Sequence, residues 1–142
     1  MSIWTTQATP EDLAALSEDS MVSHLGIEFL EVGEDYIKAR MPVDHRTHQP
    51  HKILHGGASV ALAETLGSIA ANLCIDREIK IAMGMEINAN HIRSVSDGWV
   101  YGVTKPVHLG ASTHIWEIRI SDENDKLICI SRLTMAVLPK NR

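Results

Sequence analysis

Apolar and polar positions repeat with different periods along the chain, and each change of period marks the border of a predicted element. Thr9–Asp12 places a capping hydroxyl, a proline and two acids before an apolar turn, which is typical of a helix N-terminus. We predict a short helix there and a second helical turn from Ser20 to Leu25, ending at Gly26. Strand-like alternation predicts strands at residues 27–32, 36–41, 81–93, 98–108, 113–121 and 127–138.

One long helix is predicted, from Gly57 to Ile75, and Glu64 is its only charged residue before the polar linker that follows. Helical spacing puts an apolar face against a sheet, formed by Leu62, Leu66, Ile69 and Leu73. The opposite face lacks the charges of a solvated helix and carries Gly57, Val60, Ala61, Glu64, Ser68 and Ala71. A helix that is apolar or small on all sides is buried on all sides. Gly67, which costs about 1 kcal/mol relative to Ala, indicates close approach of another helix or strand.

The order of elements is a short helix, two strands, a long helix and four strands, so we expect a single domain spanning residues 1–142. Antiparallel strands with a single long helix are typical of the α+β class, with the helix against one face of a six-stranded sheet. The chain has no spare element to cover the other face of the helix. We therefore predict that a second copy covers it and that the protein is a homo-oligomer.

Glu64 is the first candidate for a chemical role. Carboxylates are rarely buried unless they are paired or used, and we expect Glu64 to be largely buried. The structural alternatives are that Glu64 caps a neighbouring element or forms an ion pair with an arginine across the interface. The helix start, His55-Gly56-Gly57, lets another group approach the backbone closely, and the first N–H groups have no partner inside the helix. A carbonyl oxygen held there would meet a donor as well as the carboxylate about two turns further on.

Composition and charge narrow the range of partners. The net charge is −5, whereas nucleic acids and anionic membranes need a basic face, so neither is an expected partner. No segment approaches the length of a membrane span, and the first residues lack the pattern of a signal peptide. Cys74 and Cys129 have neither metal nor disulfide-framework spacing, which favours a cytoplasmic location.

The loop before the long helix carries four histidines whose spacing resembles a zinc site, namely His45, His48, His51 and His55. Pro42 and Pro50 argue against a helix that would align them, and no cysteine lies near, so we expect no metal. We also expect no cofactor, because the chain has no Gly-rich phosphate loop.

The segment LHGGASVALAETLGS, residues 54–68, resembles the helix motif of hotdog-fold thioesterases, in the branch that uses a glutamate on the central helix. The resemblance covers nearly the whole chain and implies a long central helix wrapped by an antiparallel sheet. Further segments resemble bacterial 1,4-dihydroxy-2-naphthoyl-CoA thioesterases of the menaquinone pathway and relatives that clear misacylated aryl carrier protein. They are MVSHLGIEF, MPVDHRTHQP, GMEINANHIRSVSDG and VHLGASTHIWEI.

This resemblance implies roles for individual residues. Glu64 would be the nucleophile or the general base, and the Gly56 N–H would hold the thioester oxygen. Gln49 and His55 would line the site, and Ser68 would position water or the acyl group. The assembly would be a dimer of dimers, with some CoA contacts supplied by a neighbouring subunit. The implied CoA contacts are Gly84, His91, Ile92, Arg93, Ser94, His108, Leu109, Gly110, Ala111, Ser112 and Thr113.

The leading hypothesis is hydrolysis of an aryl- or acyl-CoA, with 1,4-dihydroxy-2-naphthoyl-CoA favoured. We expect the acyl group to be selected around Val60, Ser68, Ile69 and Asn72. An aryl thioester on carrier protein, or a broad range of acyl-CoA, is the alternative substrate. A non-catalytic module that binds acyl-CoA is an alternative of another class, which the presence of Glu64 disfavours.

Overall fold

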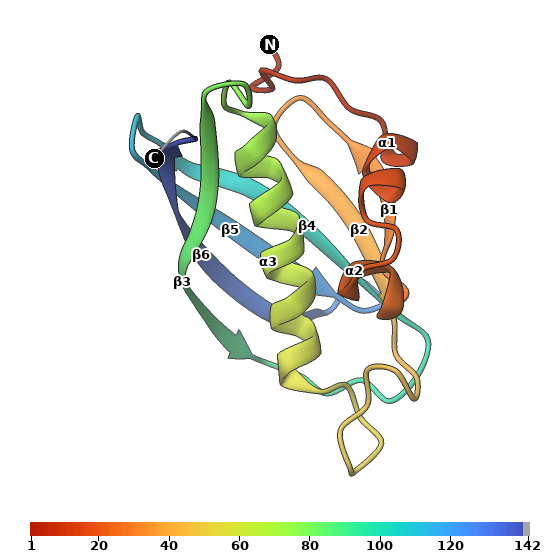
Figure 1. Cartoon of the computed structure of the whole chain (residues 1–142). Coiled ribbons are helices and arrows are strands. Elements are labelled where there is room, and N and C mark those ends of the chain that lie inside the picture. Colours follow the sequence, from red (N-terminus) through yellow and green to blue (C-terminus); the bar gives the residue numbers. More distant parts are fainter. Residues whose placement is uncertain (141–142) are drawn as a thin grey trace.

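The computed structural model describes residues 1–140 and contains a six-stranded antiparallel sheet with one long helix across one face (Figure 1). This is the predicted α+β architecture. The helices are α1 (Pro10–Leu16), α2 (Met21–His24) and α3 (Gly56–Leu73). The strands are β1 (Glu28–Val32), β2 (Ile37–Pro42), β3 (Lys80–His91), β4 (Trp99–Leu109), β5 (Thr113–Ser121) and β6 (Leu127–Pro139).

The order of strands in the sheet is β1-β2-β4-β5-β6-β3, so β1 and β3 form its two edges. After β2 the chain runs along the sheet as α3 and enters β3 at the opposite edge, where β3 pairs with β6 alone. A bulge between Gly84 and Glu86 interrupts this pairing. The other edge of β3 has no strand partner within residues 1–140, and it lies beside α3.

The inner face of α3 packs on the sheet through small residues as well as leucines. Ser59, Ala63, Gly67 and Ala70 are buried there, and a Cβ built on Gly67 would lie 2.6 Å from Cδ2 of Leu133 on β6. The close approach predicted from Gly67 is therefore with a strand of its own sheet.

Two residues of α3 were predicted on the wrong face. Ala71 is fully buried, and Ile69 is only half-buried, because the helix approaches the sheet along its small residues and the bulky Ile69 is turned outward.

The short helices α1 and α2 lie beside α3 on the same side of the sheet (Figure 1). Each begins at a capping box. In α1 the Thr9 hydroxyl accepts from the Asp12 N–H at 3.1 Å, and the Asp12 carboxylate accepts from the Thr9 N–H at 2.9 Å. Leu13 is the buried residue that anchors α1.

The first residues of the chain close the C-terminal end of α3. The N–H groups of Thr5 and Thr6 donate to the Leu73 carbonyl at 2.8 and 3.1 Å. The Trp4 indole N–H donates to the Gly33 carbonyl at 2.6 Å, and its ring stacks on Trp116 with centroids 6.4 Å apart. These contacts tie the N-terminus to the helix end and the sheet at once.

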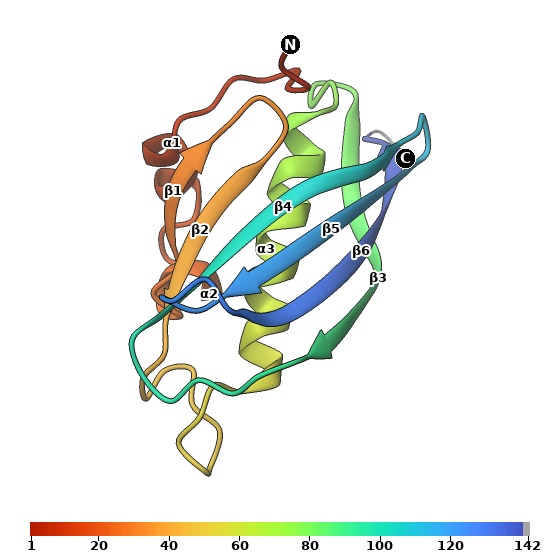
Figure 2. The ribbon, with the colours of Figure 1, turned by 180° about the vertical axis from the view of Figure 1, so that it is seen from behind.

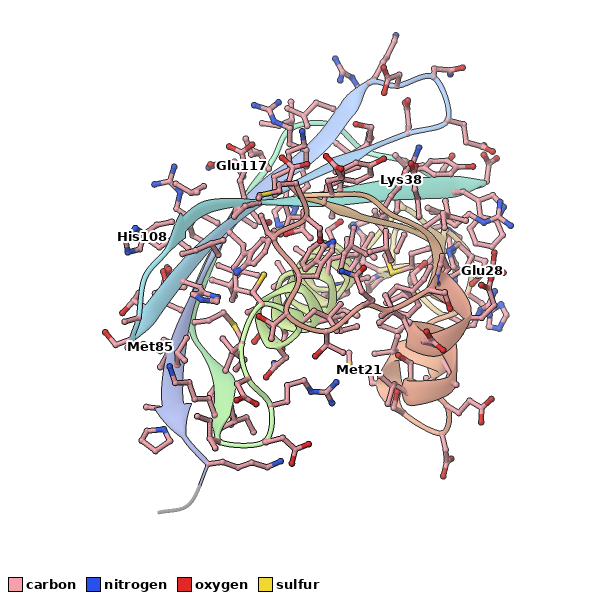
Figure 3. All side chains as sticks on the ribbon, turned by 90° about the horizontal axis from the view of Figure 1, so that it is seen from above. Met21, Glu28, Lys38, Met85, His108 and Glu117 are labelled. Carbon is pink, nitrogen blue, oxygen red and sulfur yellow. The ribbon has the colours of Figure 1, made fainter. Side chains whose placement is uncertain are left out.

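No helix of residues 1–140 covers the other face of the sheet (Figure 2). Lys38 and Glu117 project from that face, whereas Met21 lies on the helix side (Figure 3). None of the described helices is both long and apolar enough to span a membrane.

Candidate active site

An apolar cavity of about 620 Å³ lies between the α1–α2 segment and the outer face of α3. Leu16, Met21, Val22 and Leu25 form the wall on the α1–α2 side. Val60, Ala61 and Ile69 contribute the wall on α3, together with Gly57, Thr65 and Ser68. Glu64 is the one charged residue in the lining.

Most hydroxyls around this cavity are already hydrogen-bonded to the backbone. The Ser17 hydroxyl donates to the Leu13 carbonyl at 2.8 Å, and the Thr65 hydroxyl donates to the Ala61 carbonyl at 2.7 Å. The Ser20 hydroxyl donates to the Ser17 carbonyl. The Ser68 hydroxyl, one turn beyond Glu64, has no hydrogen-bond partner within residues 1–140 and is available to a ligand.

Glu64 lies at the edge of this cavity that faces β3. A Cβ built on Gly84 would be 2.6 Å from Oε2 of Glu64, so the carboxylate lies directly over the one position of β3 that has no side chain. In the single chain Glu64 is exposed, because no element within residues 1–140 covers it, so its expected burial depends on the predicted second copy. Within the described residues the carboxylate forms no ion pair.

The first turn of α3 is capped by a histidine, although the sequence indicated no capping side chain. Nδ1 of His55 accepts from the Gly57 N–H at 2.8 Å. The His55 carbonyl accepts from the N–H groups of Ala58 and Ser59 at 2.9 and 3.3 Å. An accepting Nδ1 carries no proton, so the neutral imidazole holds its proton on Nε2. In the part of the chain that is described, the Gly56 N–H has no acceptor and is the available donor of this helix start.

A second cavity, of about 330 Å³, lies at Gly56. The imidazole of His91 packs over this glycine, with Nε2 only 2.9 Å from where a Cβ would stand. The guanidinium of Arg93 donates to the Leu127 carbonyl at 2.9 Å. The lining is completed by Ile53, Leu54, Ser59, Ile92, Ser94 and Ile128. The structure thus brings the predicted segment 91–94 to the helix start.

The predicted contacts at residues 108–113 span the end of β4, the turn after it and the first residue of β5. The Gly110 N–H donates to the Thr113 carbonyl at 2.9 Å, and the His108 imidazole folds over Gly110. Thr113 pairs with Ala136 near one end of β6, whereas His91 pairs with Cys129 near the other. One chain therefore does not bring this turn, with Leu109, Ala111 and Ser112, to Gly56.

Gln49 lies in the loop before α3, where its amide oxygen accepts from the His51 backbone N–H. Neither Gln49 nor His55 lines the cavity that contains Glu64. Nε2 of His48 is 2.8 Å from the Ser96 carbonyl oxygen. No three His, Cys, Asp or Glu side chains in residues 1–140 converge as metal ligands would.

The α1–α2 wall of the cavity was not predicted from the sequence. Leu16 and Met21 are 68% and 64% exposed, and such large apolar residues on short helices were the available signal. Of the four residues expected to select the acyl group, Val60, Ser68 and Ile69 line the cavity and Asn72 does not. The Asn72 amide instead bonds to the backbone of β3.

Gly56 and Glu64 are eight positions apart on one helix, which separates their Cα atoms by about 12 Å along its axis. A glutamate leans toward the helix N-terminus but spans only part of that distance. The expectation that one carbonyl meets both groups on one chain is therefore wrong.

Comparisons with known proteins identify the family. Residues 51–129 match the model of the thioesterase superfamily. The chain is 52% identical over 96% of its length to the 1,4-dihydroxy-2-naphthoyl-CoA hydrolase of Escherichia coli, of which it covers 99%. It is 52% identical over 96% of its length to the proofreading thioesterase EntH of Cronobacter turicensis, of which it covers 98%. The crystal structure of thioesterase HI1161 from Haemophilus influenzae superposes with a TM-score of 0.95 at 50% identity, covering 99% of this chain and 97% of that one. The chain belongs to the thioesterase superfamily and is a thioester hydrolase with the hotdog fold.

Proposed function

We propose that this thioesterase hydrolyses aryl-CoA thioesters, with 1,4-dihydroxy-2-naphthoyl-CoA as the favoured substrate and Glu64 as the reacting carboxylate. The observation that carries the proposal is the position of Glu64: among residues 1–140 it is a carboxylate without an ion pair, over Gly84, at the edge of a cavity that those residues otherwise line without charge. Such a group is available either to attack a carbonyl or to accept a proton from water.

The chemistry of the cavity supports an uncharged acyl group. Its wall is aliphatic and holds no cation, so a negatively charged acyl group would lose its hydration without gaining a partner. Its volume of about 620 Å³ accommodates a bicyclic ring. The free hydroxyl of Ser68 is a partner for a ring hydroxyl or for the attacking water. The name of the Escherichia coli relative supports the naphthoyl group.

Two copies of the chain supply the complete site in this proposal. The free edge of β3 exposes Met83 and Met85, which are 51% and 67% accessible, and an unpaired edge of this length invites a second strand. Antiparallel pairing of two β3 strands places the Gly84 end of one beside the His91 end of the other. Because Glu64 lies over Gly84 and Gly56 lies under His91, the carboxylate of one copy then faces the Gly56 N–H of the other.

Hydrolysis can follow two routes from this arrangement. In the first, a Glu64 oxygen attacks the carbonyl carbon, the C–S bond breaks, and water hydrolyses the resulting anhydride. In the second, Glu64 takes a proton from water as the water oxygen attacks, and the proton passes to the departing thiolate. In both routes the Gly56 N–H stabilises the negative charge that develops on the carbonyl oxygen. The products are a carboxylic acid and a thiol.

The same reaction extends to an aryl group carried by a protein. The EntH relative is named a proofreading thioesterase, and this supports an aryl carrier protein as the alternative substrate. We place the enzyme in the cytoplasm, where Cys74 and Cys129 stay reduced. We also propose that it assembles as a tetramer of two dimers, each paired through β3. The segments at residues 91–94 and 108–113 are the proposed contacts of the CoA arm.

Mixing two inactive variants tests the two-copy site. Gly56→Pro removes the N–H but suits the first helical position, since His55 already has an extended backbone. Gly56→Ala is the matched control, because it adds the Cβ and keeps the N–H. Gly56→Pro and Glu64→Gln homodimers should both be nearly inactive. Unfolded and refolded together, they should regain about one quarter of the wild-type sites, all in mixed dimers. Absence of any recovery would contradict the shared site.

A further inference from the structure

We infer that Asn72 stops β3 from pairing beyond Gly84 and thereby sets the register in which two copies of the chain join. The inference rests on the proposed two-copy site and adds a residue that touches neither substrate nor reacting groups. Asn72 is a positioning residue: it acts on the strand edge, and through the edge on the distance between Glu64 of one copy and Gly56 of the other.

The Asn72 side chain forms hydrogen bonds with the backbone of Ala82 on the side of the free edge. Its amide oxygen accepts from the Ala82 N–H at 3.0 Å, and its amide nitrogen donates to the Ala82 carbonyl at 3.2 Å. The same nitrogen lies 2.9 Å from the Ser68 carbonyl one turn earlier on α3. The side chain therefore takes the place that a residue of a neighbouring strand would fill.

The sheet register shows that these Ala82 groups belong to the free edge. Ala82 lies opposite Val137 on β6, and the Val137 N–H donates to the Ser112 carbonyl, away from β3. In an antiparallel ladder, opposite residues turn their polar groups either toward each other or away from each other. The Ala82 N–H and carbonyl thus point away from β6, toward the side where Asn72 meets them.

Beyond this position the free edge is open. From Gly84 to His91 no residue of β3 has its outward polar groups capped by a side chain of the described residues. The bulge after Gly84 changes the direction of the strand at the border of the capped part. The stretch available for a second copy therefore begins at Gly84.

A second copy is the occupant that fits this edge. Each end of the stretch from Gly84 to His91 lies beside one half of the proposed site. Glu64 lies over Gly84, and Gly56 lies under His91. When two copies pair antiparallel about a two-fold axis, each Glu64 comes beside the Gly56 of the other copy, which gives two complete sites. A strand from any other protein would leave both half-sites incomplete.

Register decides whether the halves meet. Strand pairing with one face buried is strictly specified, but an exposed edge slips in steps of two residues, about 6.6 Å of sliding. Such a slip would move Glu64 several ångströms from a thioester carbonyl held at the Gly56 N–H of the other copy, too far for attack or for activation of water. Asn72 excludes the slip that would extend the pairing to Ala82, because that position is already satisfied.

Single-cysteine cross-linking at the edge tests the inference. Cysteine is placed in turn at Glu86, Ile87, Asn88, Ala89 and Asn90, in the wild type and in Asn72→Ala, and self-cross-linking is measured under mild oxidation. A residue links to its own copy only near the two-fold axis, where the Cβ atoms come within about 5.5 Å. The unsubstituted chain, with Cys74 and Cys129, is the blank.

We expect one sharp maximum in the wild type. In Asn72→Ala the maximum should move toward Gly84 or spread over several positions, and kcat should fall by about tenfold or more while KM changes less. Asn72→Asp keeps the acceptor for the Ala82 N–H and loses the donor to the Ala82 carbonyl, so its cross-linking and kcat should lie between those of the wild type and Asn72→Ala. If Asn72→Ala does not fold, Asn72→Asp replaces it in the experiment. Asn124→Ala, in the β5–β6 turn, should change nothing.

An unchanged maximum in Asn72→Ala would overturn the inference and leave the thioesterase activity untouched. Absence of self-cross-linking at all five positions in the wild type would overturn both the inference and the shared site. If the wild type shows the expected cross-linking pattern but hydrolyses none of the tested thioesters, the proposed function alone would be overturned.

Discussion

The Glu64 carboxylate lies against the backbone of Gly84, with Oε2 2.6 Å from where a Cβ on that glycine would stand. A side chain at residue 84 and the Glu64 carboxylate could not occupy this space together. The position needs glycine because of this close approach, since Gly84 is not among the residues with positive φ. The strand that forms the edge of the sheet thus also determines where the carboxylate can rest.

Gly84→Ala should displace the Glu64 carboxylate from its position over β3. We expect kcat/KM to fall by about tenfold or more, since a shift of about 1 Å in a reacting group has effects of this size. Stability should change by less than about 1 kcal/mol, because the group that must move is the free end of a side chain. Steady-state kinetics and thermal unfolding measured on the same sample separate the two effects. Activity at the wild-type level would show that the carboxylate works from another position.

The N-terminal segment contributes to stability through Trp4. Its ring stacks on the fully buried Trp116, and its N–H is bonded to Gly33. Trp4→Ala should lower the free energy of unfolding by about 3–5 kcal/mol, the usual cost of removing a buried tryptophan. Trp4→Phe keeps the stacking and should cost less. Equilibrium urea unfolding measures both, and equal losses would mean that the hydrogen bond, not the stacking, is the main contribution.

His114 links stability to pH. Burial of its side chain lowers the pKa of this imidazole, and repulsion from His108 lowers it further. The unfolded chain therefore takes up a proton near pH 6.5, whereas the folded chain does so only at lower pH. The stabilising contribution is complete above pH 6.5 and is lost as the pH falls below it.

His114→Gln should remove this dependence. The difference in unfolding free energy between wild type and variant should be constant above pH 6.5 and should shift in favour of the variant as the pH falls toward 5. Urea unfolding at a series of pH values measures it. A difference that stays constant through this range would mean that His114 titrates alike in both states.

Local patterns predicted the elements well. The strand at residues 113–121 is confirmed to its ends, and the long helix, expected at 57–75, spans Gly56–Leu73. Alternation does not specify which strands pair, so the position of β3 at the edge beyond β6 could not be predicted. Bulky aliphatic residues indicated the inner face of α3, but its close contact is made by Ser59, Ala63 and Gly67, which a hydrophobic pattern undervalues.

Candidates for the site could be predicted from the sequence where residue chemistry and helix geometry single them out. A single carboxylate on an apolar helix made Glu64 the first candidate, and the His-Gly-Gly start made the first N–H groups of that helix candidate donors. Long-range packing was beyond the pattern: the Leu16 and Met21 wall, the contact of Glu64 with Gly84, and the bond from Asn72 to Ala82 each join distant parts of the chain.

The central claim is that Glu64 performs thioester hydrolysis with a preference for an aryl group. The most direct measurement is steady-state hydrolysis of a hydroxynaphthoyl-CoA, benzoyl-CoA, a medium-chain acyl-CoA and an aryl-loaded carrier protein by wild type, Glu64→Gln and Glu117→Gln. Glu117 lies on the outer face of the sheet and serves as the matched control (Figure 3).

The naphthoyl thioester should lead the other substrates by about tenfold, equivalent to about 1.4 kcal/mol in transition-state binding. Glu64→Gln should lower kcat by at least about 100-fold, and Glu117→Gln should leave it unchanged. A lead by the carrier protein would replace the proposed substrate. Full activity of Glu64→Gln on every thioester would contradict the account.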